Sequence, residues 1–120
     1  MVIVLIKLLI VIQNHLYVYF FGDEFNKPVN NLPNTITKLI FGRDFNQPIN
    51  NLPKNIISLG FGRNFNQPIH DLPDTITHLR LGKSFNQSLD KLPKALIDLT
   101  MYDTSKVLSN IPKVNIIVDL

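Results

Sequence analysis

The sequence contains no cysteine, which removes two structural classes at once. Neither a disulfide framework nor a thiolate metal site can form without cysteine. Small secreted domains often depend on disulfides, so the absence favours an intracellular location, in the cytoplasm. Hydrophobic residues make up 45% of the chain and charged residues only 18%, a composition typical of a folded domain rather than a disordered one.

The motifs that carry catalysis are also missing. The three histidines are His15, His70 and His78, and none belongs to an HExxH motif. There is no glycine-rich phosphate loop and no nucleophile elbow. His70 and Asp71 form a pair typical of a solvated turn. We therefore predict that the protein is not an enzyme, with no catalytic residue, no metal site and no cofactor.

The apolar run at the start of the chain is short. MVIVLIKLLIVI ends at residue 12 and contains Lys7, whereas a transmembrane helix needs about 20 apolar residues. The run also lacks the basic start and the small-residue cleavage site of a signal peptide. Its valines and isoleucines suit a buried strand. We expect residues 1–14 to form a degenerate coil or cap with no membrane span; a cleaved signal or anchor is the alternative.

What the chain does have is an internal repeat of twenty residues. The recurring residues are Phe25, Phe45, Phe65 and Phe85; Asn26, Asn46, Asn66 and Asn86; Leu39, Leu59, Leu79 and Leu99; and Gly22, Gly42, Gly62 and Gly82. A fixed period of this length is typical of a solenoid. We expect a repeat domain at 15–120, with full repeats at 25–44, 45–64, 65–84 and 85–104 and worn ends at 15–24 and 105–120.

Each repeat contains the signals of one short strand. Leu39 and Phe41 alternate with other residues, and a period of two predicts a strand with both side chains facing inward. Gly42 ends the strand, either through a positive φ or because two backbones approach closely. Pro48 and Pro53 forbid a continuous helix between strands. The predicted fold is mainly β, a solenoid with one parallel sheet and about one strand per coil.

Equivalent residues of stacked coils should form columns through the interior. The phenylalanines at 25, 45, 65 and 85 predict an aromatic column. The asparagines at 26, 46, 66 and 86 predict a second, buried column, in which each amide bonds backbone groups that its own coil leaves without a partner. We interpret both columns as structural; ligand contact by the asparagines is the alternative.

Two segments of the repeat resemble known repeat families. The segment 36–41 is similar to the LxxLxL strand of leucine-rich repeats, and FNQPI at 45–49 resembles the core of the FNIP repeat. That family is similar to leucine-rich repeats and occurs in amoebae and in large DNA viruses that infect them. The resemblance covers roughly 15–118 and implies a short leucine-rich-repeat-like solenoid. Some members carry an F-box, but helical patterning before residue 15 is absent, so that role is not transferred.

The candidate binding residues are those that vary on the constant scaffold. Three columns vary: Val18, Lys38, Ser58, His78 and Asp98; Phe20, Ile40, Gly60, Arg80 and Thr100; and Asp23, Arg43, Arg63, Lys83 and Asp103. We expect them to line the outer surface of the sheet, which solenoids use for binding. The candidate contacts are Lys38, Ile40, Arg43, Ser58, Arg63, His78, Arg80 and Lys83. Simple solvated surface is the alternative.

Three functional hypotheses follow. The leading one is a non-catalytic protein-interaction module whose sheet face binds a partner of acidic character, consistent with a net charge of +3. The second is binding of nucleic acid or another polyanion through Arg43, Arg63 and Lys83, although the cations are few and no aromatic residue lies among them. The third is a decayed repeat protein without an independent role. Its last strand, Ile116–Leu120, would be an exposed edge that favours self-association.

Overall fold

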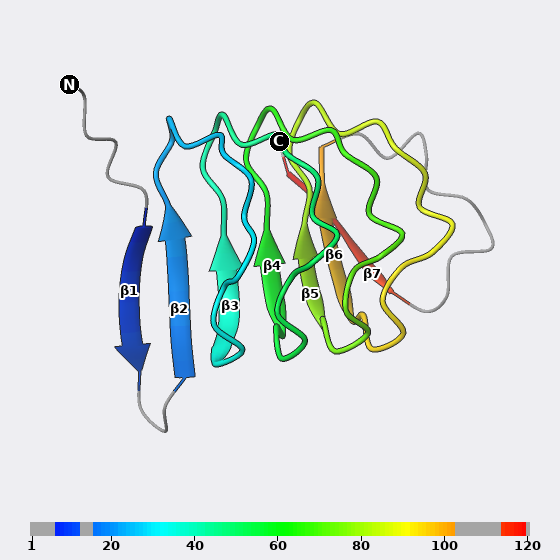
Figure 1. Cartoon of the computed structure of the whole chain (residues 1–120). Helices are drawn as coiled ribbons and strands as arrows, with labels where there is room; N and C mark the ends of the chain where they lie inside the picture. Colours follow the sequence, from blue (N-terminus) through cyan, green and yellow to red (C-terminus); the bar gives the residue numbers. More distant parts are fainter. Residues whose placement is uncertain (1–6, 13–15, 103–113, 120) are drawn as a thin grey trace.

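A computed structural model describes residues 7–12, 16–102 and 114–119 of the chain. Its described residues contain one sheet of seven strands, which lie in chain order from one end to the other (Figure 1). The strands are β1 (Lys7–Ile12), β2 (Leu16–Phe21), β3 (Ile36–Ile40), β4 (Ser58–Gly60), β5 (His78–Arg80), β6 (Asp98–Met101) and β7 (Asn115–Val118). From β2 to β7 all neighbours are parallel. The predicted leucine-rich-repeat-like solenoid with one strand per coil is confirmed.

The strand register follows the twenty-residue period. Leu39 pairs with Leu59, and Leu59 with Leu79, so each leucine lies beside its equivalent in the next coil. All three are buried, with exposed fractions of 2% or less. The strands are short because the glycine that follows and the Leu-Pro turn that precedes leave few residues free to pair.

The first strand differs from the others. β1 runs antiparallel to β2, with Lys7 opposite Phe21 and Ile12 opposite Leu16 (Figure 1). Of the two expectations for residues 1–14, a degenerate coil does not fit residues 7–12, because every coil of the solenoid contributes a parallel strand, whereas a cap is compatible with this arrangement. β1 instead pairs along the edge of β2 that faces away from β3.

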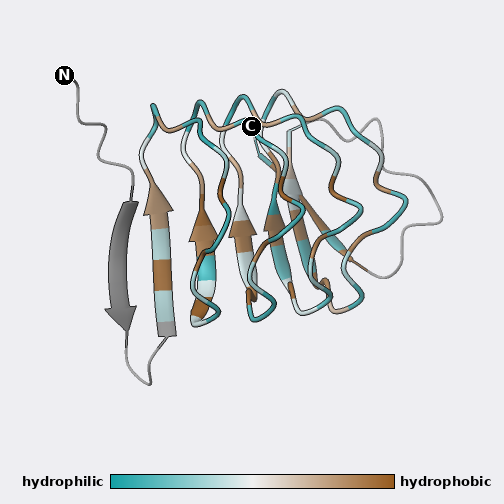
Figure 2. Cartoon of the chain, viewed as in Figure 1, coloured by the Kyte–Doolittle hydropathy of each residue, from teal (hydrophilic) through white to brown (hydrophobic). Residues whose placement is uncertain are grey.

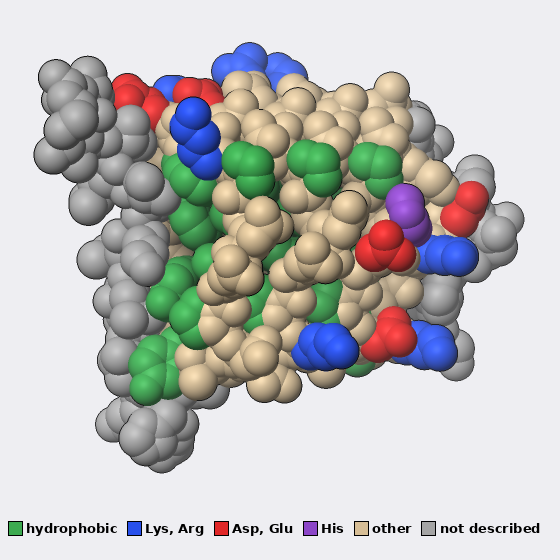
Figure 3. Space-filling view, in the orientation of Figure 1, with side chains coloured by type: hydrophobic (Ala, Val, Ile, Leu, Met, Phe, Trp, Pro, Cys, Tyr) green, Lys and Arg blue, Asp and Glu red, His purple; other side chains and the backbone are tan. Residues whose placement is uncertain are grey.

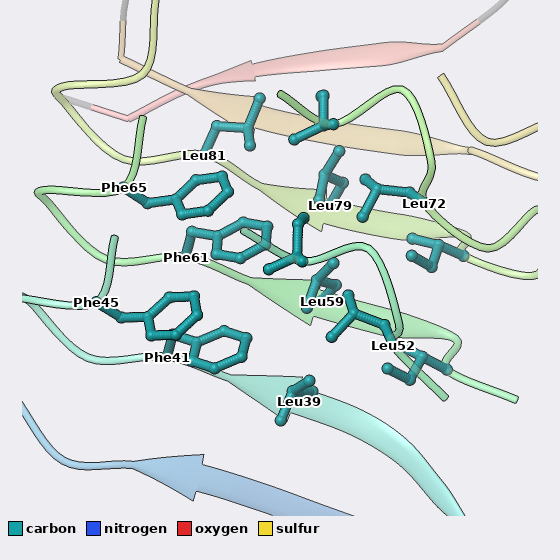
Figure 4. Packing of buried hydrophobic residues seen from close by; sticks show 14 of the residues in the cluster. Leu39, Phe41, Phe45, Leu52, Leu59, Phe61, Phe65, Leu72, Leu79 and Leu81 are labelled. Carbon is teal, nitrogen blue, oxygen red and sulfur yellow. The ribbon is translucent and has the colours of Figure 1, made fainter. Parts of the chain in front are cut away.

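Aromatic rings stack through the core. The centroid of the Phe45 ring lies 6.1 Å from those of Phe25 and Phe65, and Phe65 lies 6.3 Å from Phe85. A second column, of Phe21, Phe41 and Phe61, lies against the first: the ring centroid of Phe41 is 3.9 Å from that of Phe45 (Figure 4). The two columns fill the part of the core that lies under the loops. Along the strands on the other side of this core, hydrophobic and hydrophilic residues alternate (Figure 2).

The glycine column permits close backbone approach. None of the glycines has a positive φ. A Cβ built on Gly62 would lie only 2.2 Å from the carbonyl oxygen of Gly42, and one on Gly82 would lie 2.1 Å from that of Gly62. Such distances are impossible for a real side chain. Of the two reasons considered for glycine at this position, close approach between coils is the correct one.

The last coil is shorter than the others. Leu99 pairs with Ile116, seventeen residues later, whereas Leu79 pairs with Leu99 twenty residues later. Residues 103–113, which include part of the predicted worn end at 105–120, lie outside the described residues. The shortening brings Asp119, which follows β7, within reach of side chains on β5.

Candidate functional site

Two of the predicted variable columns lie side by side on the outer face of the sheet. Lys38 pairs with Ser58, and Ser58 with His78; Ile40, Gly60 and Arg80 pair in the same way. Because the leucine between them points into the core, these side chains point outward. Lys38, His78 and Arg80 are exposed, and Ile40 and Ser58 are half-buried.

Val18, at the start of the first column, differs from these residues. Only 5% of its surface is exposed, so it is not available to a partner. In this column the accessible side chains therefore begin at Lys38 on β3.

The third column lies in the turn that follows each strand. Asn64 N donates to Arg43 O over 3.0 Å, and Ser84 N donates to Arg63 O over the same distance. This ladder holds the turns of successive coils in register. Arg43, Arg63 and Lys83 therefore lie one coil apart from one another, and the side chains of all three are exposed. Asp103, the last predicted member, lies outside the described residues.

Several charges on this surface already have partners. Arg43 Nε donates to Asp44 Oδ1 over 2.9 Å, and this hydrogen bond raises the pKa of the guanidinium above its ordinary value. His78 Nε2 lies 3.0 Å from Asp98 Oδ2. The pair with Asp44 reduces the positive potential at the Arg43 end of the predicted strip.

Arg80 also has a partner, which comes from the end of the chain. Its Nη2 forms an ion pair with Asp119 Oδ2. The pair spans β6, because Arg80 lies at the end of β5 and Asp119 follows β7. Over half of the Arg80 side chain nevertheless stays exposed, at 57%.

Among the predicted contact residues, Lys38, Arg63 and Lys83 form no ion pair with any described residue. Arg63 and Lys83 are neighbours in the turn column. The predicted strip of three equivalent cations is therefore reduced to an adjacent pair, with Arg43 bound to its own neighbour in the chain.

Two hollows lie on the outer face. One, of about 450 Å³, is lined by Arg63, Lys83 and Tyr102 together with apolar surface. The other, of about 250 Å³, lies over the first strand column. Both are lined by Ile40, Gly60 and Arg80, so they adjoin at Gly60.

Sequence reasoning did not select Gly60 or Tyr102 as candidate contacts. The signal for Gly60 was present, because it is the one glycine outside the twenty-residue glycine column. The expectation that no aromatic residue lies among the basic side chains is wrong: Tyr102 is 39% exposed and lines the same hollow as Arg63.

The asparagine column lies on the loop side. Asn46 Oδ1 accepts from Asn66 N over 2.9 Å and from Gln67 Nε2 over 3.1 Å. Asn26 Oδ1 makes the same two bonds with the coil of Asn46. The amides thus bond groups of the next coil, and they are half-buried or exposed, which corrects the expectation of a buried column. Figure 3, which shows this side, has few charged side chains at its centre.

Comparison with known proteins agrees with this geometry. The family model of the FNIP repeat matches residues 17–44, 25–64, 45–70 and 65–103. The chain belongs to the FNIP-repeat family. No curated protein matches the chain.

One solved structure resembles the FNIP-repeat chain. It is described as the crystal structure of CroV588, a novel circular LRR protein. The two share 37% identity with a TM-score of 0.74 over 82% of this chain, which spans only 17% of that protein. Repeat families with this leucine-rich-like fold generally act as scaffolds for protein interaction rather than as catalysts.

The described part of the FNIP repeats shows no group that would hold a metal ion: no three His, Asp or Glu side chains converge there. His70 Nε2 lies 3.3 Å from Asp71 Oδ2, and both side chains are 60% exposed. His15 lies outside the described residues. No helix within those residues has the length and hydropathy to cross a bilayer.

Proposed function

We propose that this chain is a protein-interaction module that binds an acidic partner on the outer face of its sheet. The observation that carries the proposal is the adjacent pair Arg63 and Lys83, exposed, without an ion pair among the described residues, and beside a hollow of about 450 Å³. Cations at the rim of an apolar hollow attract an acidic segment and give it an apolar surface to cover.

The described scaffold supports this function physically. The outer face varies from coil to coil, while the core columns and the backbone ladders hold it in a fixed position. A rigid surface loses little conformational entropy when a partner binds. The cytoplasmic location predicted from the sequence is part of this proposal, since an intracellular partner requires it.

Polyanion binding is the competing function, and Tyr102 is the observation that favours it. An exposed aromatic ring beside cations can stack a nucleic-acid base. Against it, Arg43 and Arg80 are engaged with Asp44 and Asp119, which leaves few free cations on this face. A nucleic acid would also bind with a steep dependence on salt concentration.

The test compares two charge-reversal variants. Arg63→Glu with Lys83→Glu reverses the site, and Lys54→Glu with Lys94→Glu reverses two exposed lysines in the turns before the strands. Each variant lowers the net charge from +3 to −1, so the pair is matched. Circular dichroism checks that both fold. Each immobilised protein is exposed to host-cell lysate, and a captured protein is then purified and titrated by calorimetry.

The expected result is that the purified partner binds the wild type and the lysine variant, but binds the Arg63 and Lys83 variant at least 10-fold more weakly. Equal affinity for both variants would remove the outer face as the site. Salt-sensitive binding of random single-stranded DNA by the wild type, lost in the Arg63 and Lys83 variant, would replace the proposal with polyanion binding.

A further inference from the structure

We propose that Gly60 forms a socket on the outer face that receives an apolar side chain of an acidic, extended peptide segment. The inference rests on the proposed function and adds to it the chemistry of the partner. The anchor side chain would enter between Ile40 and Arg80, and a carboxylate two or three residues away would meet Arg63 and Lys83.

The backbone does not require glycine at position 60. Its φ is not positive, and a Cβ built there would lie 3.8 Å from Ile40 Cγ1 and 3.9 Å from Arg80 Cβ, which is ordinary van der Waals contact. At Gly62 and Gly82 the same construction collides with backbone atoms of the preceding coil. Gly60 therefore differs in kind from the recurring glycines, which are needed for stacking.

A glycine inside a strand is also unfavourable, because it adds chain entropy to the unfolded state and packs no side chain. Its column contains larger residues in the neighbouring coils, Ile40 on one side and Arg80 on the other. The missing side chain thus opens a gap in an otherwise filled row. The gap is the point at which the two hollows of the outer face adjoin.

The walls of the gap favour an apolar occupant. Ile40 is half-buried and presents its side chain to the gap, and the stem of Arg80 forms the opposite wall. The head of Arg80 points away to Asp119, with which it is paired. The larger hollow holds about 450 Å³, within the range of sites that take small ligands and therefore ample for one side chain.

The position of the free cations gives the second half of the motif. Arg63 lies three residues beyond Gly60, and Lys83 lies beside it in the next coil; both line the larger hollow. An extended peptide advances about 3.3 Å per residue, so a glutamate two or three positions from the anchor reaches about 7–10 Å. Charge complementarity therefore selects an acidic segment over a basic one.

The test uses a synthetic library of capped ten-residue peptides. The fifth residue is Leu, Phe, Ala, Asn or Lys, and the seventh and eighth are both Glu, both Gln or both Lys. Affinities are measured by fluorescence polarisation for the full chain and for a graded series: Gly60→Ala, Gly60→Val and Gly60→Leu. Asn50→Val, at an exposed loop position, is the control for adding a surface valine.

We expect peptides with an apolar fifth residue followed by glutamates to bind best. Their affinity should fall progressively along the Gly60 series, at least 10-fold for Gly60→Val, and stay unchanged in Asn50→Val. The preference for an apolar residue should disappear in Gly60→Leu, while the preference for glutamate remains. Arg63→Glu with Lys83→Glu should abolish the glutamate preference.

Two outcomes overturn the inference in distinguishable ways. If glutamate peptides bind through Arg63 and Lys83 but Gly60→Val binds them as tightly as the wild type, the socket is wrong and the proposed function stands. If no peptide binds the wild type more tightly than it binds the Arg63 and Lys83 variant, both are wrong.

Discussion

Truncating one ring in the middle of the aromatic stack should be far more costly than truncating one at its end. Phe45 is fully buried and has four ring neighbours: Phe25 and Phe65 in the same column and Phe41 and Phe61 in the other. Phe85, at the end of the same column, stacks on Phe65 alone among the described residues. The change is Phe45→Ala, and the matched control is Phe85→Ala.

The magnitude follows from what each truncation removes. A buried Phe→Ala substitution costs about 3–5 kcal/mol through lost transfer energy and the cavity left behind. Each stacked pair adds about 0.5–1.5 kcal/mol beyond area burial. Phe45 has three ring pairs more than Phe85. We therefore expect Phe45→Ala to destabilise the fold by at least about 1.5 kcal/mol more than Phe85→Ala, taking the lower bound per pair.

Urea unfolding followed by far-ultraviolet circular dichroism measures both variants, since the chain has no tryptophan for fluorescence. The free energies of unfolding are compared from midpoints at a common slope. Equal losses for the two variants, or a larger loss for Phe85→Ala, would refute the view that stacking between coils dominates the stability of the core.

Three further predictions concern the other columns. Asn46→Ala leaves the half-buried backbone N–H of Asn66 without its acceptor and should lower the free energy of unfolding in urea by about 1–3 kcal/mol. The control, Asn50→Ala at an exposed position, should change it by less than about 0.5 kcal/mol, and equal effects would contradict a structural ladder. Gly62→Ala should destabilise the fold by about 1–3 kcal/mol or more, because its Cβ would lie 2.2 Å from the carbonyl oxygen of Gly42. Gly60→Ala should stabilise the fold by about 0.5–1 kcal/mol. A stabilising effect of Gly62→Ala would contradict the close approach of the two backbones. Ile117 is 47% exposed on the edge strand β7, so it should promote self-association, and Ile117→Lys should reduce it. Gel filtration at several protein concentrations measures this, and a wild type that elutes as a monomer at every concentration would contradict the prediction.

The fold could be predicted to a large extent because the repeat is regular. Leu39, Leu59 and Leu79 fall at one spacing, and coils of equal length can bury such residues only by stacking. The valines and isoleucines of residues 7–12 favoured a strand, but the antiparallel direction of β1 could not be predicted, because these residues do not share the period and direction depends on pairing with β2.

The candidate site could be predicted only in part. The columns that contain Lys38 and Arg63 followed from the period, since equivalent positions of stacked coils must lie side by side. The hydrogen-bond partners of the asparagines did not, because an amide can reach its own coil or the next with nearly equal ease. The ion pair between Arg80 and Asp119 joins residues 39 apart and depends on a coil of a different length.

The sequence by itself determined which residues lie inside and which equivalent residues lie side by side, because a constant period leaves stacked coils little freedom of register. Only the tertiary structure decided which cations are neutralised and where the outer face is hollow. These properties depend on distances between side chains at positions that are not equivalent, such as Gly60 and Arg63, and the period places no constraint on those distances.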